Sequence, residues 1–277
     1  MPRPNLVTRF SRWTGIALVL CGLAAEAQWR GSRDLTNRGN IPTWDYSERF
    51  VHDQFWFTRA EFNGGRGWQT DYPNADLNFS WRLSQMTALK VHPDPQHLSL
   101  LDPELLNYPF IFMIDPRSLR LSEPEVEALR NYLLNGGFLM VDDFWGDQMW
   151  NGLYAEMKKV FPNIEPVPLP HDHEIFKIVF PLDGPPQVPS EDSAERTMTM
   201  PDPYRTWEDE ISWERPQPAD FRAYFDDKGR MMALICWNTD LSDGWEEEGV
   251  SHWFFENFSE KFSYPMGINI LFYVMTH

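Results

Sequence analysis

GGFLMVDDFWGD (Gly136–Asp147) is the most informative segment of the chain, because a short apolar run there ends in two adjacent carboxylates. The apolar residues, Phe138–Val141, suit a strand that is buried on both faces of a parallel sheet. The two glycines before them are typical of a helix end. Asp147 is expected to cap a second helix, which carries an apolar stripe as far as Phe161. The stretch therefore predicts the succession of helix, strand and helix that is typical of an α/β protein.

The residues before this stretch show the same alternation. Tyr108–Asp115 is an apolar run ended by Asp-Pro, as expected of another buried strand. A helix is expected to begin after Ser122, because Ser122 and Glu125 have capping-box spacing. A strand over Gln54–Phe62 and a helix beginning near Asn74 precede them. This spacing predicts βαβ units around a mainly parallel sheet.

The pattern becomes irregular towards the C-terminus. Residues 181–220 contain eight prolines and many acids, so a long irregular insertion is expected there. Two strand-like runs then flank Asp227-Lys228-Gly229, a turn signal for a hairpin. The apolar segment Ile268–Met275 predicts a closing helix. One α/β domain over 52–277, preceded by an arm over 28–51, is the simplest account.

The N-terminus has the form of a secretory signal peptide. Three arginines precede the apolar run Trp13–Ala25, and Ala25-Glu26-Ala27 has the small-x-small pattern of a signal-peptidase site. The apolar run has 13 residues, fewer than the roughly 20 that a membrane span needs. We therefore expect cleavage after Ala27 and export to the periplasm or the medium, with no stable membrane span afterwards. An uncleaved anchor is the alternative.

The composition limits the class of partner. Removal of 1–27 takes away three arginines and one glutamate, so the net charge changes from −17 to −19. Nucleic acid is disfavoured as a partner, because phosphate binding needs clustered lysines and arginines. A cationic partner or a divalent metal is compatible with the charge. Cys236, the one cysteine left, is interpreted as a small buried hydrophobe in an apolar strand.

Polar residues follow the ends of several predicted strands. In open α/β sheets, ligands bind at the carboxyl ends of the strands, so these residues are expected to meet along one rim. The candidate ligand-binding residues are Arg66, Trp68, Asp71, Tyr72, Asp115, Asp142, Asp143, Asn238 and Asp240.

Two interpretations of this rim stay open. Converging carboxylates suit Mg²⁺ or Ca²⁺, or acid–base work by two carboxyl groups with different pKa values. Alternatively, the aspartates only cap helices and form turns. Asp142 is the better functional candidate, and Asp143 is the residue expected to act as a cap.

HDHEIF, which begins at His171, adds a second candidate for metal binding. His171 and His173 on a strand would point to one face and suit zinc. No third ligand stands at a diagnostic spacing, so a structural or surface role is favoured. With the rim carboxylates included, the candidates for metal ligands are Asp142, Asp71, His171 and His173.

Several segments together resemble one bacterial family. FTRAEFNGGRGWQTDYPNADLNFSWRLSQMT, YPFIFMID, LRNYLLNGGFLMVDDFWG, VFPNIEPVPLPHDHEIF and MGINILFYVMTH are similar to the family labelled domain of unknown function 4159, over 52–277. The resemblance implies a flavodoxin-like three-layer sandwich of the class I glutamine amidotransferase type. In those enzymes the strand after the Gly-Gly turn leads into an elbow with a catalytic cysteine, whereas VDDFWG has neither Cys nor Ser. The resemblance therefore implies the fold without glutaminase activity.

Two functional hypotheses follow. The first is an exported, non-catalytic binding or assembly component of the cell envelope, with envelope proteins as the partners that the resemblance implies. The second is a hydrolase of a sugar or another small polar substrate. It would use Asp142 with Asp71 or Asp115, either as ligands of a divalent metal or as acid and base.

Overall fold

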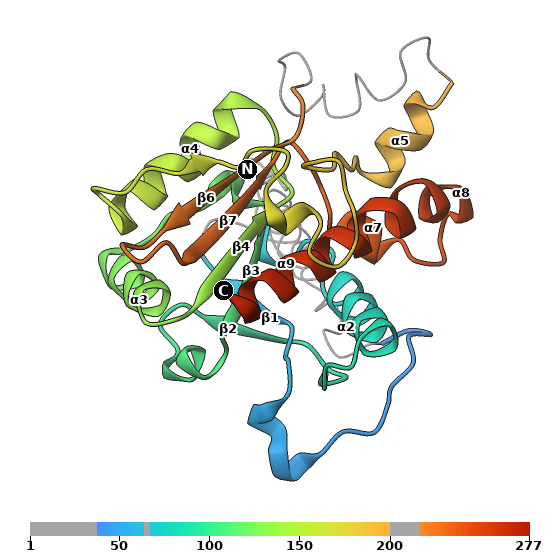
Figure 1. Cartoon of the computed structure of the whole chain (residues 1–277), viewed down its shortest axis with the longest axis horizontal. Coiled ribbons are helices and arrows are strands. Elements are labelled where there is room, and N and C mark those ends of the chain that lie inside the picture. The colour runs from blue at the N-terminus through green and yellow to red at the C-terminus, as the bar shows by residue number, and fades with distance from the viewer. Residues whose placement is uncertain (1–37, 64–66, 200–216) are drawn as a thin grey trace, which may run out of the picture. The chain divides into compact units, whose positions relative to one another are not determined.

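A sheet of seven strands, in the order β2–β1–β3–β4–β7–β6–β5, forms the centre of the fold (Figure 1). The structure is a computed structural model that describes residues 38–63, 67–199 and 217–277. The expected signal peptide and Arg66 lie outside the described residues, as does the first part of the expected arm. In the ranges that are described, no helix is long and apolar enough to cross a lipid bilayer.

Five strands of the sheet run parallel to one another. They are β1 (Thr58–Glu61), β2 (Gln96–Ser99), β3 (Phe110–Ile114), β4 (Phe138–Asp142) and β7 (Met231–Trp237). β6 (Asp220–Phe225) pairs antiparallel with β7, and β5 (Val167–Pro168) pairs antiparallel with β6. Every residue of β3, β4 and β7 is buried, as expected of strands that are covered on both faces.

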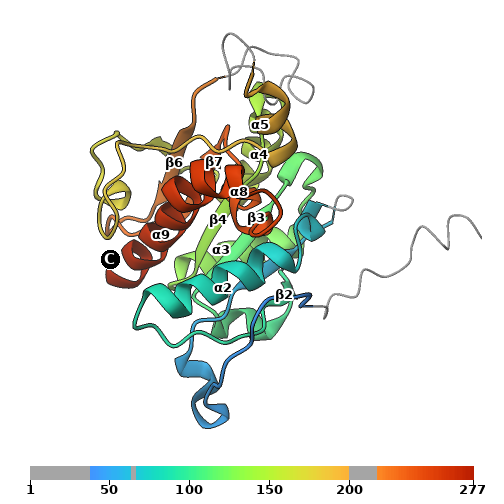
Figure 2. The same ribbon diagram turned by 90° about the vertical axis from the view of Figure 1, so that its right-hand side faces the viewer.

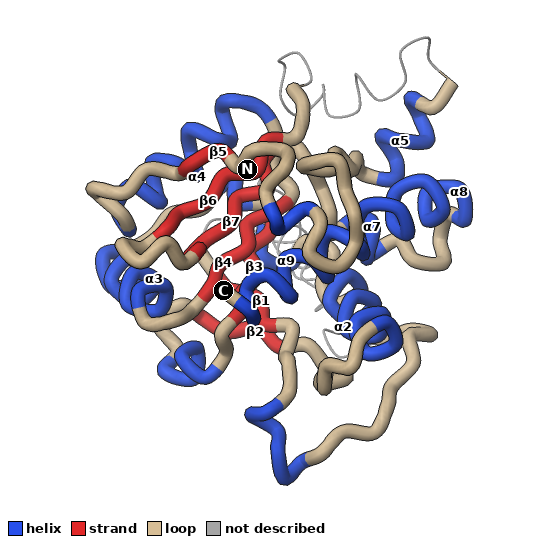
Figure 3. The backbone as a smooth tube through the Cα atoms, viewed as in Figure 1, coloured by secondary structure: helices blue, strands red, loops and turns tan. Residues whose placement is uncertain are grey.

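Helices cover both faces of this sheet (Figures 1 and 2). α2 (Asn74–Met86) and α9 (Tyr264–Thr276) contribute to the core on one face, and α3 (Glu123–Leu134) and α4 (Gly146–Val160) to the core on the other. Figure 3 shows the strands stacked between these two sets of helices. The prediction of an α/β fold with a mostly parallel sheet is confirmed.

Shorter helices complete the chain. α5 (Glu191–Thr197) lies within the insertion that was expected to be irregular, α7 (Asp243–Glu246) follows β7, and α8 (His252–Phe254) leads into a π-helical segment, Phe255–Ser263. Short 3₁₀ helices lie at Glu48–Asp53, Gly67–Gln69, Pro103–Asn107, Pro116–Ser118 and Glu174–Phe176.

The start of α3 is as predicted, and the start of α4 is not. Glu125 accepts hydrogen bonds from the backbone N–H and the hydroxyl of Ser122, at 2.8 and 2.6 Å, in the expected capping box. α4 begins at Gly146, with Asp147 already inside its first turn, so the prediction that Asp147 caps this helix is wrong. The Gly146 N–H instead donates to Asn238 Oδ1 at 2.9 Å. A residue from another strand end therefore satisfies the helix start, which no local pattern could reveal.

β2 and β5 were not predicted. β2 is half-buried at the edge of the sheet, and β5 is exposed and only two residues long. Neither carries the apolar run that marks a central strand. The hairpin turn was predicted correctly, with Gly229 at a φ of +84° between β6 and β7.

Candidate functional site

Residues with left-handed backbone mark one edge of the sheet. Among the described residues other than glycine, a positive φ occurs at Asp71 (60°), Asp115 (46°), Asp143 (55°) and Asn238 (59°). Asp115 and Asn238 directly follow β3 and β7, and Asp143 follows β4. Because these strands run parallel, their carboxyl ends form one edge, termed here the carboxyl edge. Asp and Asn adopt this conformation more readily than most residues, which explains their use at these sharp turns.

Three carboxylates meet at the carboxyl edge. One carboxylate oxygen each of Asp71, Asp243 and Glu246 lies within 4.8 Å of the others. Asp71 comes from the loop between β1 and α2, whereas the other two belong to α7, which follows β7. These three residues are termed the carboxylate triad. Only Asp71 was among the sequence candidates; the acidic run DGWEEEG after the last strand was the signal that could have revealed the other two.

Two further aspartates hold α7 at this edge. Asp142 Oδ2 accepts hydrogen bonds from the backbone N–H and the hydroxyl of Ser242, at 2.9 and 3.0 Å. Asp240 Oδ1 accepts from the backbone N–H of Asp243 at 2.9 Å and lies 3.1 Å from Ser242 Oγ, whose single hydrogen the two carboxylates share. Part of the turn-forming interpretation is therefore right, because both carboxylates bind the loop that leads into α7.

The remaining carboxylate oxygens are not all satisfied in this way. Asp71 Oδ2 and Asp142 Oδ1 are buried, and no hydrogen-bond donor within the described ranges reaches them. A buried polar atom without a partner costs about 1–3 kcal/mol, and more when it is charged. Backbone N–H groups of Leu241 and Asp143 favour the charged form of Asp142, whereas helix capping and turn formation do not explain the Asp71 oxygen.

The pKa values report a concentration of negative charge. Burial raises the pKa of Asp142 to about 7. Burial and then contact with Glu246 raise the pKa of Asp71 well above its usual range. Burial raises the pKa of Asp240 in the same direction, followed by the charges of Asp143, Asp243, Asp71 and Asp142. The acidic cluster, defined as the triad with Asp142, Asp143 and Asp240, therefore favours a positively charged ligand or bound protons.

Arg59, in β1, holds the loop that carries Asp71. Its guanidinium pairs with both oxygens of Asp76, at 2.6 to 3.0 Å, and both side chains are fully buried. It also donates to the backbone carbonyls of Trp68, at 2.9 Å, and of Thr70. This role of Arg59 was not predicted, although an arginine inside a predicted buried strand needs a partner.

The other rim candidates have different surroundings. Trp68 packs against His97, with ring centroids 5.0 Å apart, and the Tyr72 ring lies against the Arg59 guanidinium. Asp115 pairs with Arg117. Asn238 accepts from Gly146 and donates to the Pro218 carbonyl at 3.2 Å. These side chains support the loops around the acidic cluster.

The two histidine candidates lie elsewhere. They precede the 3₁₀ helix Glu174–Phe176 in a turn, so the expectation of a strand there is wrong. His173 Nδ1 accepts a hydrogen bond from the backbone N–H of Ile175 at 3.2 Å, while His171 is exposed. The pair forms no part of the carboxylate triad. Cys236 is buried in β7, as interpreted from the sequence.

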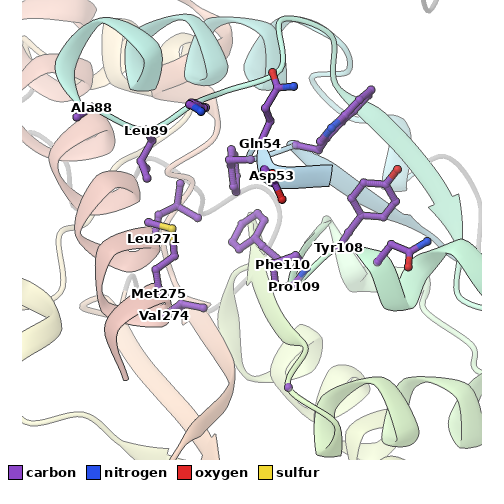
Figure 4. A pocket seen from close by; sticks show the side chains of 15 residues that line it. Asp53, Gln54, Ala88, Leu89, Tyr108, Pro109, Phe110, Leu271, Val274 and Met275 are labelled. Atoms are coloured by element: carbon purple, nitrogen blue, oxygen red, sulfur yellow. The ribbon is translucent and has the colours of Figure 1, made fainter. Parts of the chain in front are cut away.

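A cavity of about 530 Å³ lies at the opposite, amino edge of the sheet (Figure 4). Its walls include Tyr108 and Phe110 before and at the start of β3, and Leu271 and Met275 of α9. It is mostly apolar and contains none of the candidate site residues. The acidic cluster is therefore a separate site, distinguished by charge and not by a large hollow.

Comparison with known proteins identifies a family and no characterised relative. Residues 56–275 match the family described as "Domain of unknown function (DUF4159)". This match begins two residues before β1, ends one residue before the end of α9 and contains every member of the acidic cluster. No curated protein matches the sequence.

Proposed function

Because the chain belongs to the family described as domain of unknown function 4159, whose description names no activity, we propose a function from the geometry of its acidic cluster. The protein is a binding protein that takes up a hard divalent cation, Ca²⁺ or Mg²⁺, at the carboxylate triad.

The observation that carries this proposal is the buried Asp71 Oδ2, which no donor in the described part of the chain reaches, beside two more carboxylates. An ionised carboxylate in a low-dielectric interior needs a cation or a proton. Asp71 comes from the loop after β1, and Asp243 and Glu246 come from α7, so a bound cation would join these two elements. Asp243 Oδ2 also accepts a hydrogen bond from the backbone N–H of Glu191 at the start of α5, at 2.6 Å, whereas Asp71 Oδ2 has no such structural role towards any residue that the structure describes.

The ligand atoms favour one class of cation. Ca²⁺ and Mg²⁺ prefer carboxylate and carbonyl oxygens, whereas zinc and copper prefer imidazole and thiolate ligands. The triad supplies oxygen alone. Asp142 and Asp240 would hold the loop that leads into α7 and would add negative charge next to the bound cation.

A direct binding measurement tests the proposal. Isothermal titration of the purified protein with Ca²⁺, Mg²⁺ and Zn²⁺ should show binding of one or both of the first two. Asp71→Asn, which keeps the shape and removes the charge, should weaken binding at least roughly tenfold. Glu127→Gln, an exposed substitution on α3, is the matched control and should leave affinity unchanged. Absence of binding to the wild-type protein would refute the proposal.

We also propose the wider setting that the resemblance implies. The parallel strands with helices on both faces support a fold of the class I glutamine amidotransferase type, in which Asp142 and Asp143 stand where those enzymes keep a nucleophile. The lack of a cysteine or serine nucleophile at this position favours a non-catalytic component of the cell envelope. Export is supported by the N-terminal leader alone, and mass spectrometry of the exported protein should find Gln28 as its first residue.

Catalysis by the same cluster is a second candidate, favoured by Asp142. This carboxyl is fully buried, keeps one oxygen that no described donor reaches, and has a pKa of about 7. Such a group can exchange a proton at neutral pH. Hydrolysis of sugar or phosphate esters by the cation-loaded protein, lost in Asp142→Asn with cation binding retained, would support this candidate. No hydrolysis across such a panel would leave the binding role alone.

A further inference from the structure

A rare helical geometry lies against the proposed site. The segment Phe255–Ser263 is π-helical and continues directly into α9. π-helical turns are uncommon and occur frequently at functional sites. This segment packs against α7, which supplies two members of the carboxylate triad.

Building on the proposed cation site, we infer that a close contact between Ser263 and Gly244 sets the distance across the triad. A Cβ on Gly244 would lie 2.6 Å from Ser263 Cβ and closer still to Ser263 Oγ. The hydroxyl could rotate away, but Ser263 Cβ is fixed to the backbone of the π-helical segment. Only glycine therefore allows α7 to approach this closely.

The position of Gly244 explains the consequence for the site. It directly follows Asp243 and stands two residues before Glu246, so a shift of the backbone here moves both carboxylates. Asp71 belongs to a different loop, which Arg59 holds from β1. Displacement of α7 would therefore change the separation between the two halves of the triad.

α7 has little freedom to move in another direction. Asn78 of α2 donates to the Trp245 carbonyl at 2.7 Å, and the ring of Trp245 lies 2.8 Å from where a Cβ on Gly267 of α9 would be. α7 is thus held between α2 on one side and the π-helical segment and α9 on the other. Pressure from the Ser263 side would be transmitted to the triad.

The relevant property of Ser263 is the small size of its side chain, which lets α7 lie close to the π-helical segment. Ser263 Oγ is buried and makes no hydrogen bond with any residue that the structure describes, and the same is true of Ser259 Oγ. Hydrogen bonding therefore does not account for the serine at position 263. A Cβ on Gly244 would lie 3.5 Å from Ser259 Cα, an ordinary contact, so Ser263 alone sets the limit.

Substitutions at the two contacting positions test this inference. Gly244→Ala should raise the dissociation constant for Ca²⁺, or for Tb³⁺ as a luminescent substitute, about tenfold or more. Gly244→Ala with Ser263→Gly should restore it to within about threefold of the wild type, because both obstructing atoms are gone. Gly244→Ala with Ser263→Ala should not, because the Ser263 Cβ position stays filled.

A matched control separates positioning from loss of stability. An added Cβ on Gly137, between α3 and β4, would overlap the Tyr132 ring. Tyr132 belongs to the core on the α3 and α4 face, whereas Trp245 of α7 belongs to the other core. Gly137→Ala should therefore lower the melting temperature and leave cation affinity unchanged.

The outcomes distinguish this inference from the proposed function. If the wild-type protein binds the cation and Gly244→Ala binds it with the same affinity, the positioning role of the Ser263–Gly244 contact is overturned and the proposed function stands. If Gly244→Ala does not fold, the variant with Ser263→Gly decides: wild-type affinity supports the role, and a folded variant without binding overturns it. If the wild-type protein binds no cation, the proposed function and this inference fail together.

Discussion

Asp71 and Asp142 differ from ordinary turn-forming aspartates in how their oxygens are used. A capping carboxylate is satisfied by backbone N–H groups. Asp142 has that role with one oxygen only, towards Ser242, and its other oxygen is buried without a described donor. Asp71 Oδ2 is in the same state. Asp142 is therefore a structural junction through one oxygen, and the proposed site depends on the oxygens that make no hydrogen bond with a described residue.

Replacement of Asp71 should have opposite effects on stability and binding. In the presence of a chelator, Asp71→Asn should raise the free energy of unfolding by about 1 kcal/mol or more. The reason is that burial and Glu246 raise the pKa of the Asp71 carboxyl group, which means that its charged form is unfavourable in the folded protein. In excess Ca²⁺ the wild-type protein should be the more stable one. Urea unfolding under both conditions measures this. Destabilisation by the substitution in the chelator would contradict the account of unfavourable crowding.

At the scale of elements, a side chain at the end of a strand caps a helix that has no capping residue of its own. α3 starts at its own capping box, whereas the first N–H of α4 is satisfied by Asn238 at the end of β7. Asn238 also donates to the Pro218 carbonyl in front of β6. This one side chain therefore ties α4 and β6 to the end of β7.

Two substitutions at Asn238 separate its hydrogen bonds from its backbone conformation. Asn238→Gly keeps the left-handed conformation (φ 59°) and loses the hydrogen bonds, which should cost about 1–3 kcal/mol. Asn238→Ala should cost roughly 1 kcal/mol more, because alanine adopts positive φ less readily. Urea unfolding of the pair gives both values. Equal costs for the two variants would show that the conformation carries no penalty here.

At the scale of the whole molecule, the two edges of the sheet differ in character. The chain has a net charge of −17, and the strand order brings Asp142 at the end of β4, Asp240 after β7 and Asp71 after β1 to the same edge. Apolar residues from α9 and the start of β3 line the cavity at the other edge. The sheet thus has an acidic, buried edge and a mostly apolar one.

This arrangement predicts an unusual dependence of stability on pH. The pKa of Asp142 is raised in the folded protein from 3.8 to about 7, so the folded state holds this proton more tightly than the unfolded state does. Its contribution to stability is complete below about pH 4 and is lost as the pH rises through about 7. In a chelator, the melting temperature should therefore rise between about pH 7 and about pH 5.

Added Ca²⁺ should reverse this trend, because cation binding requires deprotonated carboxylates. Thermal unfolding across the same pH range, with chelator and with excess Ca²⁺, tests both slopes. Asp142→Asn should flatten the slope in the chelator. A melting temperature in the chelator that instead falls as the pH is lowered from about 7 to about 5 would show that these carboxyl groups are already ionised in the folded protein.

Elements marked by a local sequence pattern were predicted correctly, and elements that depend on distant contacts were not. The apolar runs before Asp115 and Asp142 identified β3 and β4, and Ser122 with Glu125 identified the start of α3, because these signals are local. β2 was missed because an edge strand needs no continuous apolar run. Asp147 was misassigned because the true partner of the α4 start lies far along the chain.

The α/β class, the central strands and the excess of negative charge follow from the sequence alone, because periodicity and composition are local properties of the chain. Which carboxylates meet depends instead on the tertiary structure. Asp71 and Asp243 come together because β1 and β7 end at the same edge and because α7 is held between α2 and the π-helical segment. Contacts between such distant segments depend on strand order and helix packing, which no local pattern records.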